Sequence, residues 1–302
     1  MAEFPTVISP GEWISVFRSV MRWPCEERAL VLKAMQIEHH VTEQPDGCHV
    51  LVPAALVPLA MEQLRLYAHE NPRRHIEPWP DIAAARGMAG AAGFVIALLV
   101  AYLIQAGYRW GIDWTETGQL IAGRVTAGEW WRTITALTLH GDVAHVVGNM
   151  LFGAFFTYLC GQYLGSGVAL LAIVWSAAAG NLLNALVQSG AHRSIGASTA
   201  VFAALGLVAA FVWGLSRRYA LGWARRSSPV VGAVALLAYT GTGDQQTDIV
   251  AHLAGFLAGA VAGLLLLRLK RGQTAGALAQ GLAGLLAGGT VIAAWVVAMT
   301  GG

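Results

Sequence analysis

Five polar side chains with the chemistry for acyl transfer lie near the starts of long apolar segments. His140, His145 and Asn149 belong to "LHGDVAHVVGNM", Ser198 to "GASTAVFAALG" and His252 to "DIVAHLAGFLAG". His145 and Asn149 are spaced i, i+4, so a helix places both on one face. Polar groups are costly in apolar segments of this kind and usually have a function there.

These residue types allow nucleophilic catalysis. His252 could accept the proton of the Ser198 hydroxyl as a general base, and hydrogen-bond donors could stabilise the oxyanion that develops. The donors would be His145, Asn149 and the backbone N–H of Ser198, near the positive end of a helix. Gly196 would permit an irregular backbone approach that a side chain would block.

A third, carboxylate member of such a site is hard to identify. Asp248 precedes His252 by one helical turn, and Asp142 precedes His145 by three residues. Both fall in or beside loops, so a Ser–His dyad is the simpler interpretation. Taken singly, each polar residue also has a structural interpretation, because small and polar residues mediate contacts between membrane helices.

Composition indicates that the motifs belong to a membrane protein. Of the 302 residues, 56% are hydrophobic and 12% are charged, against roughly 25% charged residues in soluble proteins. The formal net charge is +2 and the basic residues form short clusters, so nucleic acid is not an expected partner. The three cysteines are too few and too scattered for a disulfide framework or a metal site. The chemistry described above calls for no cofactor and no metal.

Residues 1–75 have the pattern of a small soluble α+β domain. The pattern predicts helices over residues 26–36 and 56–70 and strands over residues 37–43 and 48–53. The start of the chain lacks the apolar run of a cleavable signal peptide, so we expect the amino terminus on the cytoplasmic side. Residues 76–88 are expected to form a linker to the membrane.

Seven apolar stretches follow, each close to the roughly 20 residues that cross a bilayer core of about 30 Å as a helix. They cover residues 89–108, 144–161, 167–188, 198–215, 229–243, 249–267 and 276–299, and none contains an acidic residue. We therefore expect an all-α polytopic membrane bundle. Six spans lie in residues 89–270, and residues 271–302 add a C-terminal transmembrane helix.

Positive charges predict the orientation of the spans, because cytoplasmic loops are enriched in Lys and Arg. Four arginines between residues 217 and 226 follow the fourth span, and three cations between residues 268 and 271 follow the sixth. The second, fourth and sixth spans then start on the outer side, and their polar residues lie within about 10 Å of the outer surface. Small residues at four-residue steps from Ala251 to Gly263 favour packing of the sixth span against the fourth.

These motifs resemble those of the rhomboid intramembrane serine proteases. "GEWWRTITALTLHGDVAHVVGNMLFG" is similar to the family's Trp-Arg loop and second helix, "GASTAVFAALG" to its fourth helix, and "AHLAGFLAG" to its sixth. The resemblance covers residues 89–270. It implies an endopeptidase that cleaves single-span membrane proteins in the lipid bilayer near the outer face, with Ser198 as nucleophile, His252 as base, and His145 and Asn149 in the oxyanion hole.

The resemblance also implies supporting residues. Trp131 and Arg132 belong to the signature of the first loop, and Phe202 matches the position whose ring packs against the catalytic histidine. The segment around residues 240–248 would form a mobile cap. His140, at the membrane edge, has either a supporting role in the site or an interfacial one. The small domain resembles cytoplasmic domains of some bacterial members, which implies a multi-pass protein of the bacterial inner membrane.

One residue departs from the family's pattern. Thr199 stands where the motif has glycine, and its β-branched side chain could crowd the entrance or the oxyanion hole. Two alternatives to proteolysis stay open. One is a rhomboid-like pseudoprotease that binds membrane clients without cutting them, although such proteins typically lose the serine or the histidine. The other is a transporter with an intramembrane histidine relay, although that class usually has acidic residues in its spans.

Overall fold

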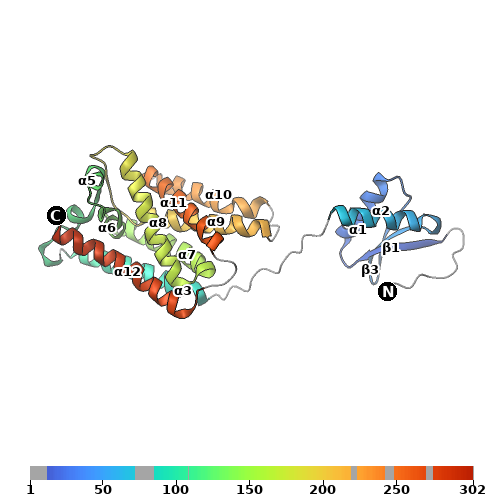
Figure 1. Ribbon diagram of the computed structural model, residues 1–302, viewed down its shortest axis with the longest axis horizontal. Coiled ribbons are helices and arrows are strands. Elements are labelled where there is room, and N and C mark those ends of the chain that lie inside the picture. The colour runs from blue at the N-terminus through green and yellow to red at the C-terminus, as the bar shows by residue number, and fades with distance from the viewer. Residues whose placement is uncertain are drawn as a thin grey trace. The chain divides into compact units, whose positions relative to one another are not determined.

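A computed structural model describes residues 12–71, 85–107, 109–218, 223–241, 248–269 and 275–301. The chain divides into two compact units, residues 1–75 and residues 76–302. Figure 1 shows a sheet with two helices in the first unit and a bundle of long helices in the second. Most of the linker at 76–88 and of the segment around 240–248 lies outside the described residues.

The small unit is a three-stranded antiparallel sheet with two helices. In chain order its elements are β1 (Trp13–Ser19), α1 (Arg22–Ala34), β2 (His40–Gln44), β3 (Gly47–Pro53), η1 (Ala54–Leu56) and α2 (Val57–Glu70). The strands lie in the order β1-β3-β2. Their buried apolar residues meet those of both helices in one core, which includes Leu32, Val50 and Ala60.

Three details of this unit differ from the sequence prediction, and one is that β2 begins at His40 instead of residue 37. β1 was missed, because a register shift between Ser15 and Phe17 interrupts the alternation that identifies a strand. α1 begins at Arg22 instead of residue 26. Pro24 does not prevent the earlier start, since it falls in the first turn, where the backbone N–H has no helical partner.

In the second unit, the described residues include seven long helices. They are α3 (Ala85–Ala106), α7 (Val143–Leu164), α8 (Ser166–Val187), α9 (Ser198–Arg218), α10 (Trp223–Gly241), α11 (Ile249–Leu269) and α12 (Ala277–Thr300). Each corresponds to one predicted span. The largest disagreement is at α10, which starts six residues before the predicted start at Pro229, because this proline lies inside the helix.

Five of these helices, α3, α7, α8, α11 and α12, are long and apolar enough to cross a membrane. In α9 and α10 the residues whose side chains are described include the apolar stretches Ser198–Gly214 and Ser227–Leu236. The chain is therefore a multi-pass membrane protein. The predicted fold class, a helical membrane bundle with a small α+β domain, is confirmed.

α9 and α11 pack together more extensively than any other pair of helices. A Cβ added at Gly206 of α9 would overlap the carbonyl oxygen of Phe256, and one at Gly259 of α11 would overlap that of Ala203. The two backbones approach so closely because small residues face each other. The predicted contact between the fourth and sixth spans is confirmed, and it places the start of α9 beside the start of α11.

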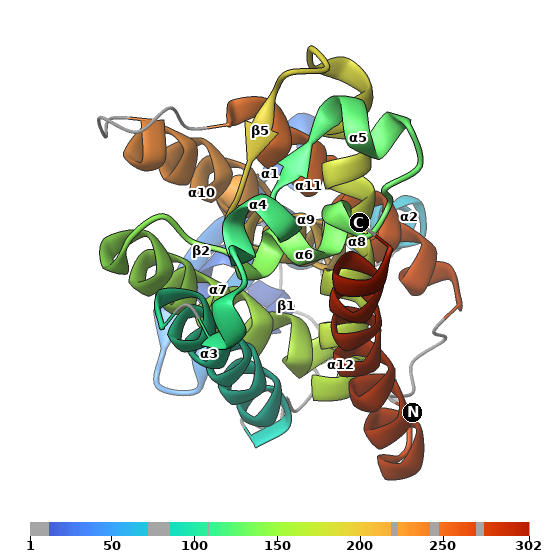
Figure 2. The ribbon, with the colours of Figure 1, turned by 90° about the vertical axis from the view of Figure 1, so that its left-hand side faces the viewer.

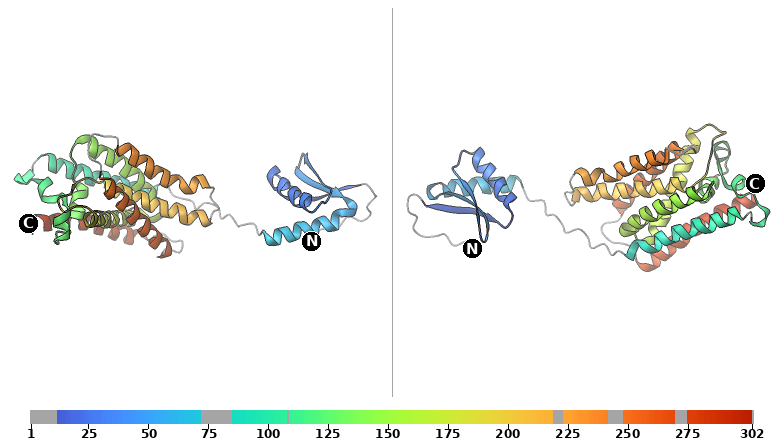
Figure 3. Two further views of the ribbon diagram at one scale, coloured as in Figure 1. Left: turned by 90° about the horizontal axis from the view of Figure 1, so that it is seen from above. Right: turned by 180° about the vertical axis from the view of Figure 1, so that it is seen from behind.

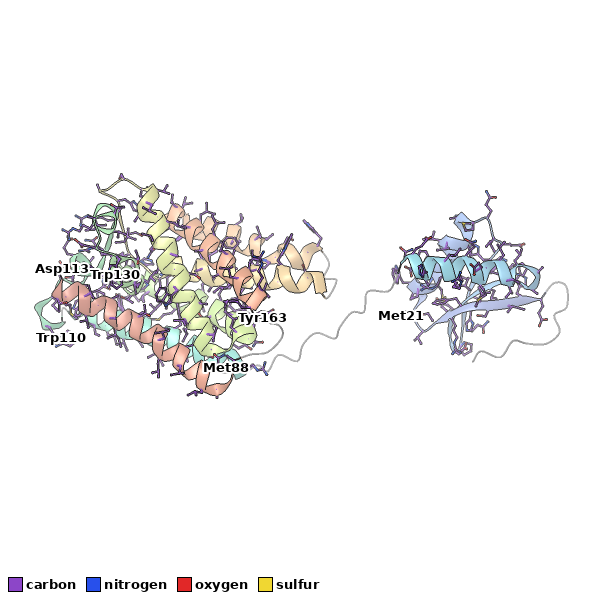
Figure 4. All side chains as sticks on the ribbon, viewed as in Figure 1. Met21, Met88, Trp110, Asp113, Trp130 and Tyr163 are labelled. Carbon is purple, nitrogen blue, oxygen red and sulfur yellow. The ribbon has the colours of Figure 1, made fainter. Side chains whose placement is uncertain are left out.

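The connection between α3 and α7 folds into short elements. They are η2 (Arg109–Gly111), α4 (Trp114–Gly118), β4 (Leu120–Ile121), α5 (Ala122–Thr126), α6 (Arg132–Thr135) and η3 (Ala136–Thr138). β4 pairs with β5 (Arg193–Ser194) from the loop before α9. Figure 2 shows α4, α5, α6 and β5 together at one end of the bundle. In Figure 4, Trp110, Asp113 and Trp130 lie at this end, and Met88 and Tyr163 lie toward the other.

α12 runs along the edge of the bundle and contacts both ends of it (Figures 1 and 3). At one end the Gln280 amide donates to the carbonyl of Leu164 over 2.7 Å and accepts from the backbone N–H groups of Gly167 and Val168. At the other end the indole N–H of Trp295 donates to Thr138 Oγ1 over 3.1 Å. The added helix thus joins the start of α8 to the connection between α3 and α7.

Candidate active site

Ser198 and His252 form a hydrogen-bonded pair where α9 and α11 begin. His252 Nε2 lies 2.8 Å from Ser198 Oγ, although the two residues are 54 positions apart in the sequence. Ser198 is the first residue of α9, and His252 lies one turn into α11. The close packing of the two helices brings the pair together, and His252 is almost entirely buried.

The imidazole of His252 is held by stacking. The Phe202 ring lies parallel to it, with centroids 4.5 Å apart and an interplanar angle of 14°. Phe202 follows Ser198 by one turn of α9, so the helix that carries the serine also orients the histidine. Among the described residues, His252 Nδ1 has no hydrogen-bond partner.

The two carboxylates considered from the sequence have other contacts. Asp142 Oδ1 accepts the backbone N–H of His145 and caps the start of α7. Asp248 accepts from Ala251 N, Asn184 Nδ2 and His192 Nε2. Neither carboxylate bonds the His252 ring, because Nε2 lies against Ser198 Oγ and Nδ1 has no partner among the described residues.

Gly196 brings the loop before Ser198 against the side chains of α7. Its φ is +125°, a conformation that L side chains rarely adopt. A Cβ at this position would lie 2.7 Å from His145 Nε2 and 3.7 Å from Asn149 Nδ2. Asn149 Nδ2 is buried and without a partner in the part of the chain that the structure describes. A free donor of this kind, next to a backbone that only glycine allows, suits a developing oxyanion.

His140 supports the same loop. Its Nε2 accepts the backbone N–H of Ala197 over 3.3 Å, and its ring meets that of His145 edge-on at 5.0 Å. The Gln105 side chain bonds both the N–H and the carbonyl of His140, each at 3.0 Å. Of the two roles that the sequence left open, contact with the loop before Ser198 is the one these bonds favour.

Among the described residues, no hydrogen bond or ring contact joins Trp131 or Arg132 to Ser198 or His252. The Arg132 guanidinium is buried and bonds the carboxylate of Glu129 and the carbonyl oxygens of Glu116 and Gln119. Trp131 caps α6 and accepts from Thr135 through its carbonyl. Trp131 and Arg132 thus belong to the first loop. This loop contacts the segment before Ser198, because its Ala136 carbonyl accepts the N–H of Gly196 over 2.9 Å.

Thr199 faces helices α8 and α11. A Cβ at Gly180 would lie 3.1 Å from Thr199 Cγ2, and one at Gly255 would lie 2.9 Å from it. The methyl group therefore occupies space left by these two glycines. Gly180 and Gly255 thus make room for this methyl group between α8 and α11.

Sequence reasoning missed several polar residues beside the pair. Gln105 holds His140, and Asn184 and His192 bind the carboxylate of Asp248. The signal for Gln105 and Asn184 was available, since each is a polar residue in an apolar span. Within the described ranges, no group of three His, Cys, Asp or Glu side chains could hold a metal ion.

Comparison with known proteins bears on the same region. The rhomboid domain family matches residues 127–269, which contain all three motifs. The resemblance to the rhomboid family that the motifs predicted is confirmed over these residues.

Two relatives of the rhomboid domain extend the comparison. The chain is 35% identical over 129 residues to Rhomboid-like protease 3 of Toxoplasma gondii, which covers 43% of this chain and 49% of that protein. It is 27% identical over 146 residues to YdcA of Bacillus subtilis (strain 168), named after the same protease family, which covers 48% of this chain and 72% of that protein. The chain thus spans about half the length of the first relative.

Proposed function

We propose that this chain is an intramembrane serine endopeptidase that uses a Ser198–His252 dyad. The observation that carries the proposal is the 2.8 Å contact between Ser198 Oγ and His252 Nε2. The rhomboid domain and the protease names of both relatives support it. A serine hydroxyl is a weak nucleophile until a base within hydrogen-bond reach accepts its proton.

In the first half of the reaction, Ser198 Oγ attacks the carbonyl carbon of the scissile peptide while His252 Nε2 takes the hydroxyl proton. The resulting oxyanion accepts hydrogen bonds from Asn149 Nδ2, His145 and the backbone N–H of Ser198. When the tetrahedral intermediate collapses, the C–N bond breaks and the amine leaves with the proton from His252. An acyl-enzyme on Ser198 is left.

In the second half, His252 takes a proton from water, which attacks the acyl carbon. The same donors stabilise the second oxyanion. Collapse breaks the ester bond, returns the proton to Ser198 Oγ and releases the carboxylic acid. Each donor acts only where charge develops, so its contribution falls on the transition state.

The substrates we propose are single-span membrane proteins, cut in or near their transmembrane segments. α7, α9 and α11 begin near the outer side if the arginine clusters after α9 and α11 lie in the cytoplasm. The site then lies close to the outer face, the amino terminus is cytoplasmic and the protein resides in a cell membrane. We assign catalysis to residues 89–270 and regard the helix within residues 271–302 as an addition to this core.

The test is cleavage of a transmembrane reporter by the purified full chain in lipid. Ser198→Ala and His252→Ala should each reduce the rate by at least about 10³-fold. Ser227→Ala is the matched serine control, since Ser227 Oγ bonds only carbonyls of its own helix, those of Trp223 and Ala224. His69→Ala, in the small unit, is the histidine control.

Labelling of Ser198 by a fluorophosphonate separates a protease from a pseudoprotease. The proposal predicts that the parent and both controls are labelled and that Ser198→Ala is not. Equal labelling of parent and Ser198→Ala, with no cleavage of the reporter, would remove the protease assignment and favour a rhomboid-like binding protein.

A further inference from the structure

The carboxylate of Asp248 joins three segments of the chain near the proposed site. Its Oδ1 accepts the backbone N–H of Ala251 over 3.0 Å. Its Oδ2 accepts from Asn184 Nδ2 over 2.6 Å and lies 2.7 Å from His192 Nε2. Asn184 belongs to α8, and His192 belongs to the loop that leads to Ser198.

Asp248 also holds the turn that carries His252. Its carbonyl oxygen accepts the N–H of His252 over 3.1 Å, while its side chain caps the same turn through Ala251. The first N–H groups of a helix have no partner within the helix, so a capping carboxylate fixes how the helix begins. The place of the His252 ring therefore depends on where Asp248 is held.

The loop that carries His192 is fixed on its other side as well. The His192 carbonyl accepts the N–H of Ala122 over 3.0 Å, and Arg193 and Ser194 pair with β4. Four residues after His192, the N–H of Gly196 donates to Ala136. A bond from this loop to Asp248 thus links the segment before Ser198 to the turn before His252.

The charge of Asp248 suits this arrangement. Burial raises the pKa of this carboxyl group, but the hydrogen bonds from Ala251, His192 and Asn184 outweigh burial and hold the pKa below its usual range. The carboxylate therefore stays ionised at neutral pH. An ionised acceptor makes stronger hydrogen bonds than a neutral one.

We infer that Asp248, Asn184 and His192 form a hydrogen-bonded cluster that sets the distance between Ser198 and His252. The inference rests on the proposed function, and Asp248 is then a positioning residue, because it acts on His252 through the helix start without bonding its ring. A displacement of about 1 Å in such a pair can cost up to roughly 100-fold in rate.

The first arm of the test measures catalysis by the full chain in lipid. Asp248→Ala should lower kcat and the rate of fluorophosphonate labelling of Ser198 by about tenfold per folded molecule, with KM changed less than about twofold. Asp248→Asn keeps the helix cap and should lose less, about threefold. Asp113→Asn is the matched control, since Asp113 caps α4 by accepting the N–H of Glu116 over 2.9 Å.

A double-mutant cycle tests the link itself. His192→Gln alone should lower the labelling rate, and adding it to Asp248→Ala should cause little further loss, because the bond is already gone. Two results would overturn the inference. One is that the losses of labelling rate in His192→Gln and Asp248→Ala add in the double variant, and the other is that labelling per folded molecule does not change.

Hydrogen exchange supplies a readout that needs no activity. Asp248→Ala should weaken the protection of residues 189–197 and 249–254 together, whereas Asp113→Asn should change neither. If the parent is not labelled, the proposed function fails. The exchange data still decide whether the hydrogen-bonded cluster links the two segments. Loss of protection confined to residues 249–254 would show a helix cap alone and contradict the link to the loop before Ser198.

Discussion

Two close helix contacts of the bundle, α9 with α11 and α8 with α12, use their polar groups differently. Where α12 meets α8, both ends of the Gln280 amide are occupied by backbone groups. Where α9 meets α11 beside the start of α7, the described residues leave the buried nitrogens Asn149 Nδ2, His145 Nδ1 and His252 Nδ1 without partners. Both contacts rely on glycine, as Gly167 touches Gln280 and Gly259 touches Ala203.

The bonded polar groups at Gln280 and the unpaired ones near Ser198 should therefore have different roles. A buried polar group without a partner costs about 1–3 kcal/mol, so such groups persist only where they have another use. At Gln280 the hydrogen-bonding capacity stabilises the start of α8. In the function proposed above, the unpaired donors beside Ser198 serve the bound substrate. Substitutions at the first contact should therefore reduce stability, and those at the second should reduce activity.

The largest expected effect is at Asn149. Asn149→Ala should lower kcat by about 10²- to 10³-fold, because a donor to the oxyanion is removed. The midpoint of thermal unfolding should stay close to that of the parent, since Asn149 Nδ2 has no partner to lose. Reporter cleavage and a thermal melt on the same sample measure both. A large loss of stability with kcat unchanged would abolish the distinction between the two contacts.

The opposite result is expected at Gln280. Gln280→Leu removes the acceptor of the Gly167 and Val168 N–H groups and should destabilise the bundle by about 2 kcal/mol. Labelling of Ser198 per folded molecule should stay within about twofold of the parent. Gln280→Glu is the matched variant, since it keeps the acceptor oxygen and loses only the donor to Leu164. A loss of labelling that exceeds the loss of folded protein would show that α12 acts on the site.

Thr199 should have a smaller effect. Thr199→Gly removes the methyl group from the space beside Gly180 and Gly255 and should cost about 1 kcal/mol of stability. Because the methyl group points toward α8 and α11, kcat should change less than about threefold. If kcat instead rises more than tenfold, the threonine crowds the site and the packing explanation is wrong.

The smallest effect on the labelling of Ser198 is expected in the small unit, at Asp46. Both oxygens of its carboxylate have hydrogen-bond partners, Arg18 and His49. Hydrogen bonds from His49 and Arg18 hold the pKa of Asp46 below its usual range. Its contribution to stability is present above the unfolded pKa of about 3.9 and is lost as the pH falls through the lower, folded value. Hydrogen exchange of residues 40–53, corrected for the intrinsic pH dependence, should show this loss in the parent and not in Asp46→Asn. The pH dependence of Ser198 labelling should be the same in both.

Much of the site could be predicted from the sequence. Ser198 and His252 stand out because a serine and a histidine near the starts of apolar helices are costly, and the alternation of spans puts both at one end of the bundle. Asn149 follows from its helical spacing to His145, and Phe202 was implied by the family resemblance. The contact of α9 with α11 follows from the glycines at four-residue steps.

The rest depended on contacts that local patterns do not carry. Asn184 and Asp248 are 64 residues apart and come from different helices, so only the packing of α8 beside α11 shows that they meet. The orientation of Thr199 is likewise set by Gly180 and Gly255 on two other helices. β1 was not predicted from the sequence, because its irregular register breaks the period-two pattern of a strand.

The central claim is that the Ser198–His252 pair is a working nucleophile and base. Its most direct test is mass-spectrometric identification of the residue that a fluorophosphonate modifies in the full chain, compared in the parent and His252→Ala. The account predicts one adduct, on Ser198, formed at least about 10³-fold more slowly in His252→Ala. Labelling of other serines at similar rates, or an adduct on Ser198 whose rate does not depend on His252, would contradict it.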